Sequence, residues 1–146
     1  MIRTSANAGF TLVEILVVIA ILSLLAGVVM VNILPNLGLG NQAAAKTQIA
    51  NFASALNTYR IAHGRFPTEA QGLDALVRAP TVPPVPKNYP AGGYLTGGEV
   101  PSDPWGRAYI YLAPGRQNEP FEVLSYGADG LEGGSGEDAD LSSSHP

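Results

Sequence analysis

Cysteine is absent from this chain of 146 residues, and charged residues are scarce. Without cysteine there can be no disulfide, no cysteine-ligated metal or iron–sulfur cluster and no thiol nucleophile. Only 14% of the residues are charged, and 8 Lys and Arg face 12 Asp and Glu, which gives a formal net charge of -4. Because affinity for nucleic acid comes mainly from Lys and Arg that neutralise phosphates, this balance argues against a nucleic-acid partner. The length predicts one domain.

Motifs typical of enzymes are missing as well. The sequence has no P-loop, no G-x-S-x-G motif and no Ser/His/Asp arrangement. Its two histidines, His63 and His145, are too far apart in the chain to suggest a metal site. The single tryptophan, Trp105, is expected to pack in the core. We therefore predict that the chain is not an enzyme and has no catalytic residue.

A long apolar run lies near the amino terminus. Ile15 to Leu34 are uncharged and mostly aliphatic, and about 20 such residues are needed for a helix to cross a bilayer. Small residues precede this run, whereas a conventional cleaved signal peptide would have them after it. The positive-inside rule places Arg3 in the cytoplasm and the polar remainder on the other side. We therefore predict a membrane protein with a single span.

Glu14 lies one turn into the predicted membrane helix, where a carboxylate is unfavourable unless it has a partner or a function. Two interpretations are open. In the first, Glu14 lies at headgroup depth and is solvated. In the second, Glu14 pairs with a cation. Cleavage between Gly9 and Phe10 would supply one, as the new α-amino group of Phe10 in the same chain or in a neighbouring copy.

Helical spacing returns after the apolar run. Pro35 and the glycines around it weaken the pattern, so the continuity of the helix at Pro35 is left open. From residue 42 to 63 apolar residues again follow a helical period, and Gly64 is expected to end the helix. The side chains expected to face the core are Ala45, Ile49, Phe52, Ala53, Leu56 and Tyr59 or Arg60.

The rest of the chain favours short elements and loops. Residues 68–71 read as a capping box that opens a short helix ending near Arg78, before a loop rich in proline. Residues 109–112 and 121–124 are predicted to form a hairpin, and residues 93–95 a short third strand. Because so small a sheet is not stable alone, we expect it to pack on the 42–63 helix in an α+β fold.

The segment 125–140 is rich in both acid and glycine. Its carboxylates repel one another and glycine loses much backbone entropy, so the segment should fold poorly without help. Calcium prefers six to eight oxygen ligands, which carboxylates and backbone carbonyls can supply. The spacing does not match an EF-hand. A solvated acidic tail and a calcium-binding loop both stay open on the residues alone.

The start of the chain resembles a known processing signal. Residues 8–15 read Ala-Gly-Phe-Thr-Leu-Val-Glu-Ile and precede the apolar run, as in type IV prepilins and pseudopilins. The resemblance implies that residues 1–9 are a leader, that a prepilin peptidase cleaves between Gly9 and Phe10, and that Phe10 is N-methylated. It also implies that Phe10 and Glu14 act together in assembly.

Further blocks of the chain resemble the major (G-type) pseudopilins of type II secretion systems, in the same order and over nearly the whole length. These blocks are Phe66-Pro67-Thr68, Gln71 to Leu76, Asn88-Tyr89-Pro90, Gly93-Tyr94-Leu95, Asp103 to Gly106 with Tyr109, Gly127 to Gly130 and Asp138-Ala139-Asp140. The resemblance implies a type IV pilin-like fold. In that fold a transmembrane and filament-core helix (10–34) precedes a periplasmic domain (35–146), which contains the 42–63 helix, a small antiparallel sheet and a calcium loop near the carboxyl end.

In that family the acidic loop binds one structural calcium ion. Carried over to this chain, the ligands would be the carboxylates of Asp129, Asp138 and Asp140 and the carbonyl oxygens of Tyr126 and Ser135. Glu132 and Glu137 are expected to face solvent.

The resemblance further implies a subunit of the bacterial inner membrane that polymerises into a periplasmic pseudopilus and drives folded proteins across the outer membrane. Its expected partners are other copies of the chain, minor pseudopilins, the prepilin peptidase, the inner-membrane assembly platform and the outer-membrane secretin. Two alternatives are kept. One is a type IV pilin of a surface filament for adhesion or motility, and the other is a monomeric, membrane-anchored calcium-binding module.

Overall fold

The computed structural model describes residues 10–144, and of residues 27–37 only the backbone. Gly9, where we predict cleavage, lies outside the described residues. The chain divides into two compact units, Met1–Leu37 and Gly38–Pro146. The predicted boundaries at residues 9/10 and 34/35 stay predictions.

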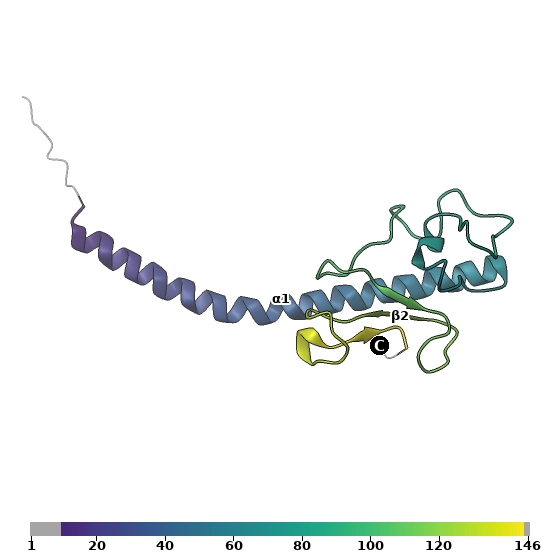
Figure 1. Ribbon diagram of the computed structural model, residues 1–146. Coiled ribbons are helices and arrows are strands. Elements are labelled where there is room, and N and C mark those ends of the chain that lie inside the picture. Colours follow the sequence, from purple (N-terminus) through teal and green to yellow (C-terminus); the bar gives the residue numbers. More distant parts are fainter. Residues whose placement is uncertain (1–9, 145–146) are drawn as a thin grey trace, which may run out of the picture. The chain divides into compact units, whose positions relative to one another are not determined.

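The main helix, α1 (Leu12–His63), is 52 residues long (Figure 1). It includes Pro35, so the backbone is helical across the residue at which the sequence left continuity open. Gly64 ends it with a φ of 75°, and the Gly64 N–H donates to the Arg60 carbonyl at 2.7 Å. The predicted carboxyl-terminal cap is therefore confirmed.

A search of the helical residues that the structure fully describes finds no stretch long and apolar enough to cross a membrane. The predicted span, Ile15 to Leu34, extends into the segment of which only the backbone is described.

The described residues form a three-stranded antiparallel sheet of β1 (Ile110–Leu112), β2 (Glu122–Ser125) and β3 (Leu141–Ser142), in the order β1-β2-β3. Tyr111 pairs with Val123, and Ser125 with Leu141. The predicted hairpin is confirmed, although β1 begins one residue later than predicted and β2 is displaced by one residue. The strand patterns of the sequence did not locate β3, which follows the acidic segment.

The expected third strand at residues 93–95 is wrong. Gly93 has a φ of 66°, which is not strand geometry, and the N–H groups of Tyr94 and Leu95 both donate to the Leu76 carbonyl. These two N–H groups therefore hold a turn against the short 3-10 helix η1 (Leu73–Leu76). They are not available for hydrogen bonds to a neighbouring strand. A Cβ on Gly93 would lie 2.7 Å from the Leu76 carbonyl oxygen, so this close approach depends on glycine.

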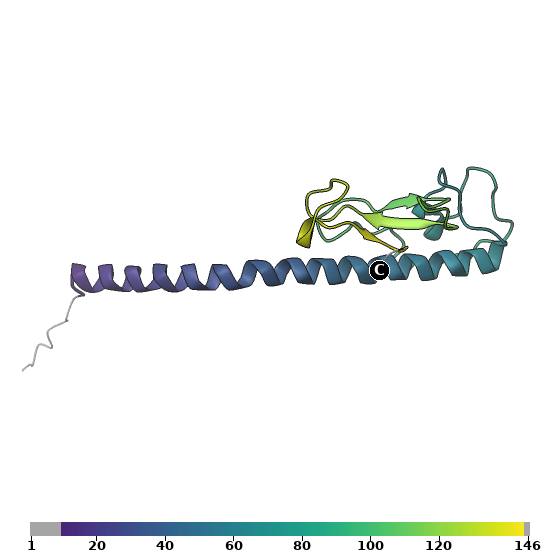
Figure 2. The ribbon, with the colours of Figure 1, turned by 90° about the horizontal axis from the view of Figure 1, so that it is seen from below.

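Within the second unit, one face of α1 packs on the sheet, as Figure 2 shows. The buried residues of that face are Ala45, Ile49, Phe52, Ala55, Leu56 and Tyr59. The Phe52 ring meets Tyr109 edge to face, with 5.1 Å between ring centroids. Ala53 was expected in the core but is only half-buried, because the helical period carries the face from Phe52 to Ala55. Tyr59 is buried and Arg60 is exposed, so Tyr59 is the residue of this pair that faces the core.

The segment that follows α1 is compact but mostly without regular structure. The capping box forms, since Thr68 N–H donates to Gln71 Oε1 and Gln71 N–H to Thr68 Oγ1, at 3.0 and 3.3 Å. The helix expected to reach Arg78 is reduced to turns and η1, because Gly72 takes a φ of 61° just before it. Trp105 is half-buried and packs against the core, as predicted.

Candidate functional site

The first candidate site is the start of α1. Thr11 occupies the N-cap position, and its hydroxyl oxygen accepts a hydrogen bond from the Glu14 N–H at 3.2 Å. Glu14 is in the first turn, where a carboxylate interacts favourably with the positive end of the helix dipole. The T-x-x-E spacing of a capping box was visible in the sequence, but sequence analysis did not assign Thr11 this role.

Large apolar side chains in the described part of the first unit lie in solvent. Phe10 is 79% exposed and Leu12 is 80% exposed, and the same holds at every large apolar position through Leu25. The exposed residues are Phe10, Leu12, Val13, Ile15, Leu16, Val17, Val18, Ile19, Ile21, Leu22, Leu24 and Leu25. A helix that is apolar on all sides needs an apolar environment from outside the chain.

The second candidate site is the acidic loop, residues 126–140, which joins β2 to β3 and contains the 3-10 helix η2 (Gly136–Asp138). The loop has a first arm, residues 126–131, which follows β2, and a second arm, residues 136–140, which leads into β3. The two arms are in contact, because the Ala128 N–H donates to the Glu137 carbonyl at 2.9 Å. Gly127 has a φ of 60°, and a Cβ there would lie 2.7 Å from the carbonyl carbon of Asp138. The arms can approach this closely only because residue 127 is glycine.

The predicted calcium ligands have local hydrogen bonds. Oδ1 of Asp129 accepts from the Leu131 N–H at 3.0 Å, and Oδ2 of Asp140 accepts from the Gly133 N–H at 3.1 Å. The Tyr126 carbonyl accepts from Gly130 N–H, and the Ser135 carbonyl from Asp138 N–H. Within residues 10–144, no three or more Asp, Glu or His side chains gather into a group that could hold a metal. Glu132 and Glu137 are exposed, as expected.

One atom of the loop is nevertheless suited to a cation. Oδ1 of Asp140 is buried and has no hydrogen-bond partner among the described residues. A buried carboxylate oxygen without a donor is costly, and a bound cation would remove that cost. The types of donor in the loop also fit, because carboxylates and carbonyls on a backbone rich in glycine are the oxygen ligands that calcium takes.

The buried carboxylate of Asp103 holds the sheet next to the acidic loop. Asp103 is 5% exposed, and it accepts from the N–H groups of Trp105 and Arg107 and from the Ser125 hydroxyl, at 3.1, 2.7 and 2.6 Å. The Arg107 guanidinium in turn donates to the carbonyls of Gly127 and Ala128, at 2.8 and 2.7 Å. Sequence analysis assigned no role to Arg107, because contacts across some twenty residues leave no periodic signal.

A second arginine reaches the loop from the β1–β2 turn. Arg116 pairs with the buried Glu122 at 2.9 Å and with the exposed Glu132 at 3.3 Å. Hydrogen bonds from the Arg116 side chain, together with one from the Ser142 hydroxyl, lower the pKa of Glu122 from 4.5 to about 2, against the opposing effect of burial. Glu122 is therefore a carboxylate that stays ionised inside the sheet.

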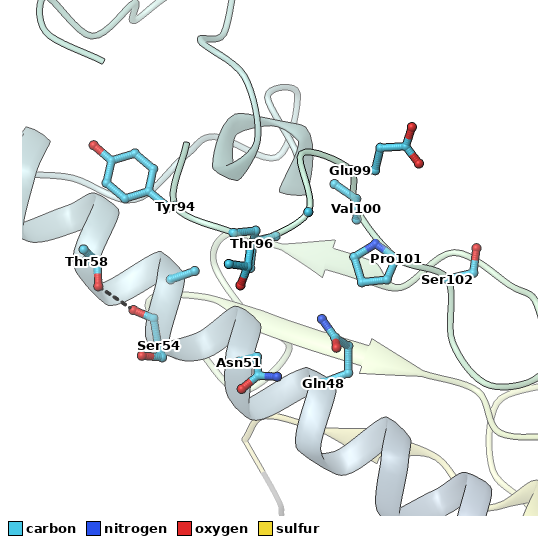
Figure 3. Close-up of a pocket in the computed structure, with 13 residues that line it drawn as sticks. Gln48, Asn51, Ser54, Thr58, Tyr94, Thr96, Glu99, Val100, Pro101 and Ser102 are labelled. Atoms are coloured by element: carbon cyan, nitrogen blue, oxygen red, sulfur yellow. Dashed lines mark hydrogen bonds between the residues drawn. The ribbon is translucent and has the colours of Figure 1, made fainter. Parts of the chain in front are cut away.

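A groove of the second unit, with a volume of about 730 Å³, lies between α1 and residues 94–102. Figure 3 shows the side chains that line it. Polar α1 side chains, including Gln48, Asn51 and Ser54, form one wall. Glu99 is the one charged residue among those that line it, and no histidine, lysine or arginine does. The lining is therefore mostly neutral, with Glu99 as its single charge.

Comparison with known proteins gives consistent matches along the chain. Residues 32–144 match the family model described as type II secretion system (T2SS), protein G, and residues 4–30 match the prokaryotic N-terminal methylation motif. A type II secretion system core protein G from Pseudomonas aeruginosa is 45% identical over 92% of this chain and 93% of its own length. One from Vibrio cholerae is 43% identical over 97% of this chain and 94% of its own length.

A solved structure matches as well. The crystal structure of the major pseudopilin from the type 2 secretion system of enterohaemorrhagic Escherichia coli superposes with a TM-score of 0.63 at 34% sequence identity. The match covers 77% of this chain and 93% of that one. The long helix packed on a small antiparallel sheet is thus a pilin-like fold, as the sequence predicted.

Proposed function

The chain belongs to the protein G family of the type II secretion system and is a pseudopilus subunit, and on this premise we propose how its described residues serve assembly. Copies of the chain associate through the apolar start of α1. The observation that carries this proposal is the exposure of every large apolar side chain from Phe10 to Leu25. Before assembly lipid covers this surface, and afterwards neighbouring copies cover it.

The proposed processing step prepares the amino terminus for packing. A prepilin peptidase cleaves between Gly9 and Phe10 and methylates the new α-amino group of Phe10. The amine then carries a positive charge, and Glu14 compensates it in the apolar surroundings of the filament core. The N-cap contact between Thr11 and the Glu14 backbone supports this, because it keeps the first turn helical up to the new end.

For location, we propose a single-pass protein of the bacterial inner membrane whose carboxyl-terminal unit lies in the periplasm. The match to the N-terminal methylation motif and the apolar run support this proposal. The growing filament would contact minor pseudopilins, the inner-membrane platform and the outer-membrane secretin. Its extension would push folded proteins through the outer membrane. In this role the subunit is structural and performs no catalysis.

We also propose that the acidic loop binds one structural calcium ion. Asp129, Asp138 and Asp140 would supply carboxylate oxygens, and Tyr126 and Ser135 carbonyl oxygens. The unpartnered buried Oδ1 of Asp140 supports the proposal. Calcium would neutralise the loop and tie it to the sheet, and binding only to the folded state would stabilise that state.

Calcium removal tests this part. The full chain in detergent is expected to unfold at a lower temperature in chelator than in calcium, as measured by the fluorescence of its one tryptophan, Trp105. At a calcium concentration of 100 times Kd, the stabilisation would be about 2.7 kcal/mol. Addition of magnesium in place of calcium is the control. An unchanged midpoint, with no calcium found by elemental analysis, would return the loop to a solvated acidic segment.

The secretion role is tested in cells. In a strain that lacks this chain, we expect folded exoproteins to stay in the periplasm, and complementation to return them to the medium. Surface pili should be intact in both strains. Normal secretion with loss of surface filaments or motility would instead support a type IV pilin. Normal secretion with no filament defect would support a monomeric calcium-binding module.

A further inference from the structure

Arg107 is the side chain that connects the sheet to the first arm of the acidic loop. It lies at the end of a tight turn, residues 103–107, in which the Asp103 N–H donates to the Arg107 carbonyl at 2.7 Å. The Arg107 N–H donates back to the Asp103 carboxylate at 2.7 Å. The same carboxylate accepts from the hydroxyl of Ser125, the last residue of β2. The backbone that carries Arg107 is therefore fixed to the strand from which the loop starts.

From that position the guanidinium reaches two consecutive carbonyls of the loop. It donates through separate nitrogens to Gly127 and Ala128, and these bonds are stronger than neutral ones because the donor is charged. Gly130 makes room for it, since a Cβ on Gly130 would lie 2.5 Å from Arg107 Nε. The first arm thus turns around the guanidinium.

The two residues that Arg107 holds lie between two predicted calcium ligands, Tyr126 and Asp129. They also connect to the second arm, because the Ala128 N–H donates to the Glu137 carbonyl next to Asp138. We propose that Arg107 holds the first arm of the acidic loop in its folded position before metal binds, and is thereby a positioning residue for calcium. This inference rests on the calcium role proposed above.

The physical reason is the conformational entropy that the first arm loses when it becomes ordered. Gly127 and Gly130 both take positive φ values, and glycine loses more conformational freedom on ordering than any other residue. With Arg107 in place, that cost is met when the chain folds. Without it, calcium must order the arm as it binds, and its apparent affinity falls.

The test is calcium titration of the full chain in detergent, by calorimetry after chelator treatment. Arg107→Ala is expected to raise the Kd for calcium about 10- to 100-fold, the range found when groups that orient metal ligands are removed. Arg107→Lys should give a smaller rise, because lysine keeps the charge and can donate to the loop but lacks the fixed planar fork of the guanidinium. Arg78→Ala is the matched control, since it removes the same charge from an exposed pair with Asp74. Its Kd should equal that of the wild type.

A second readout separates positioning from a general loss of stability. In chelator, the amides of residues 126–131 should exchange hydrogen faster in Arg107→Ala than in the wild type, while those of β1 exchange equally. An unchanged Kd, or equal exchange of the arm in chelator, would overturn the inference. If Arg107→Ala does not fold, as judged by Trp105 emission, Arg107→Lys decides, and wild-type affinity in that variant overturns the inference.

Failure of the calcium proposal itself looks different. It would be seen as absence of calcium binding in the wild-type chain, and it would overturn both ideas. Failure of the Arg107 inference alone leaves wild-type binding intact and is seen only in the comparison of variants.

Discussion

The two halves of α1 use their apolar side chains in opposite ways. From Leu12 to Leu25 every large apolar residue is exposed, whereas Ile49, Phe52 and Leu56 are buried against the sheet. Polar residues such as Asn51 occupy the solvent side of the second half, and the first half has almost none. The second half finds its partner within the chain. The first half has no such partner among the described residues, and in the proposed function lipid or other copies of the chain supply it.

The largest effect is expected on filament assembly, from a change in the first half of α1. Glu14→Ala should abolish filaments while the chain still inserts in the membrane, because the amine of Phe10 then lacks its counter-charge. Sedimentable filaments and carbonate-resistant membrane association would be measured in the same cells. Glu69→Ala, which removes an equal charge from an exposed turn, is the control and should assemble normally. Normal filaments with Glu14→Ala would leave that residue as a solvated carboxylate.

Replacing one large apolar side chain by alanine in each half of α1 tests how much each contributes to the stability of the folded chain. Phe52→Ala is expected to lower the free energy of unfolding of the second unit by about 3–5 kcal/mol, because it leaves a cavity against Tyr109. Leu16→Ala, at an exposed position, should change it by less than about 0.5 kcal/mol. Urea unfolding of the full chain in detergent, followed by Trp105 fluorescence, measures both. Equal losses would contradict the contrast between the halves.

A smaller effect is expected from pH. The pKa of Glu122 is about 2 in the folded chain and 4.5 as the ordinary value, so its ionised form stabilises the fold above about pH 4.5. This contribution, on the order of 3 kcal/mol, is lost as the pH falls from about 4.5 to about 2. Glu122→Gln should remove that part of the pH dependence and destabilise the chain at pH 6. Unfolding midpoints between pH 2 and 6 measure it, and parallel profiles would contradict the assignment.

Local rules predicted much of the fold. The helical period identified Phe52 and Leu56 as core and left Tyr59 or Arg60 open, and the glycine at position 64 marked the end of α1. The hairpin was expected from strand formers on either side of turn residues. Residues 93–95 were misassigned as a strand, because their composition is that of a strand while their N–H groups are taken by the Leu76 carbonyl.

The candidate sites divide in the same way. The processing motif around Phe10 and Glu14 is contiguous, so it could be recognised from the sequence. Arg107 could not be recognised, because its partners Gly127 and Ala128 lie 20 and 21 residues further along the chain. Glu122 could not be recognised either, because its burial and its hydrogen bond from Ser142 depend on the fold. The calcium ligands remain a proposal, supported by the unpartnered oxygen of Asp140.

The sequence by itself determined what depends on neighbours along the chain: the helix with its cap, the apolar run, the processing motif and the acidic, glycine-rich composition of the loop. Only the tertiary structure decided which strand completes the sheet, that Ala55 and Tyr59 are buried while Ala53 is half-buried and Arg60 exposed, and which arginines hold the loop. The physical reason is that backbone propensity and apolar period act over a few residues. Charge-assisted hydrogen bonds and core contacts join residues that the sequence separates by twenty or more positions.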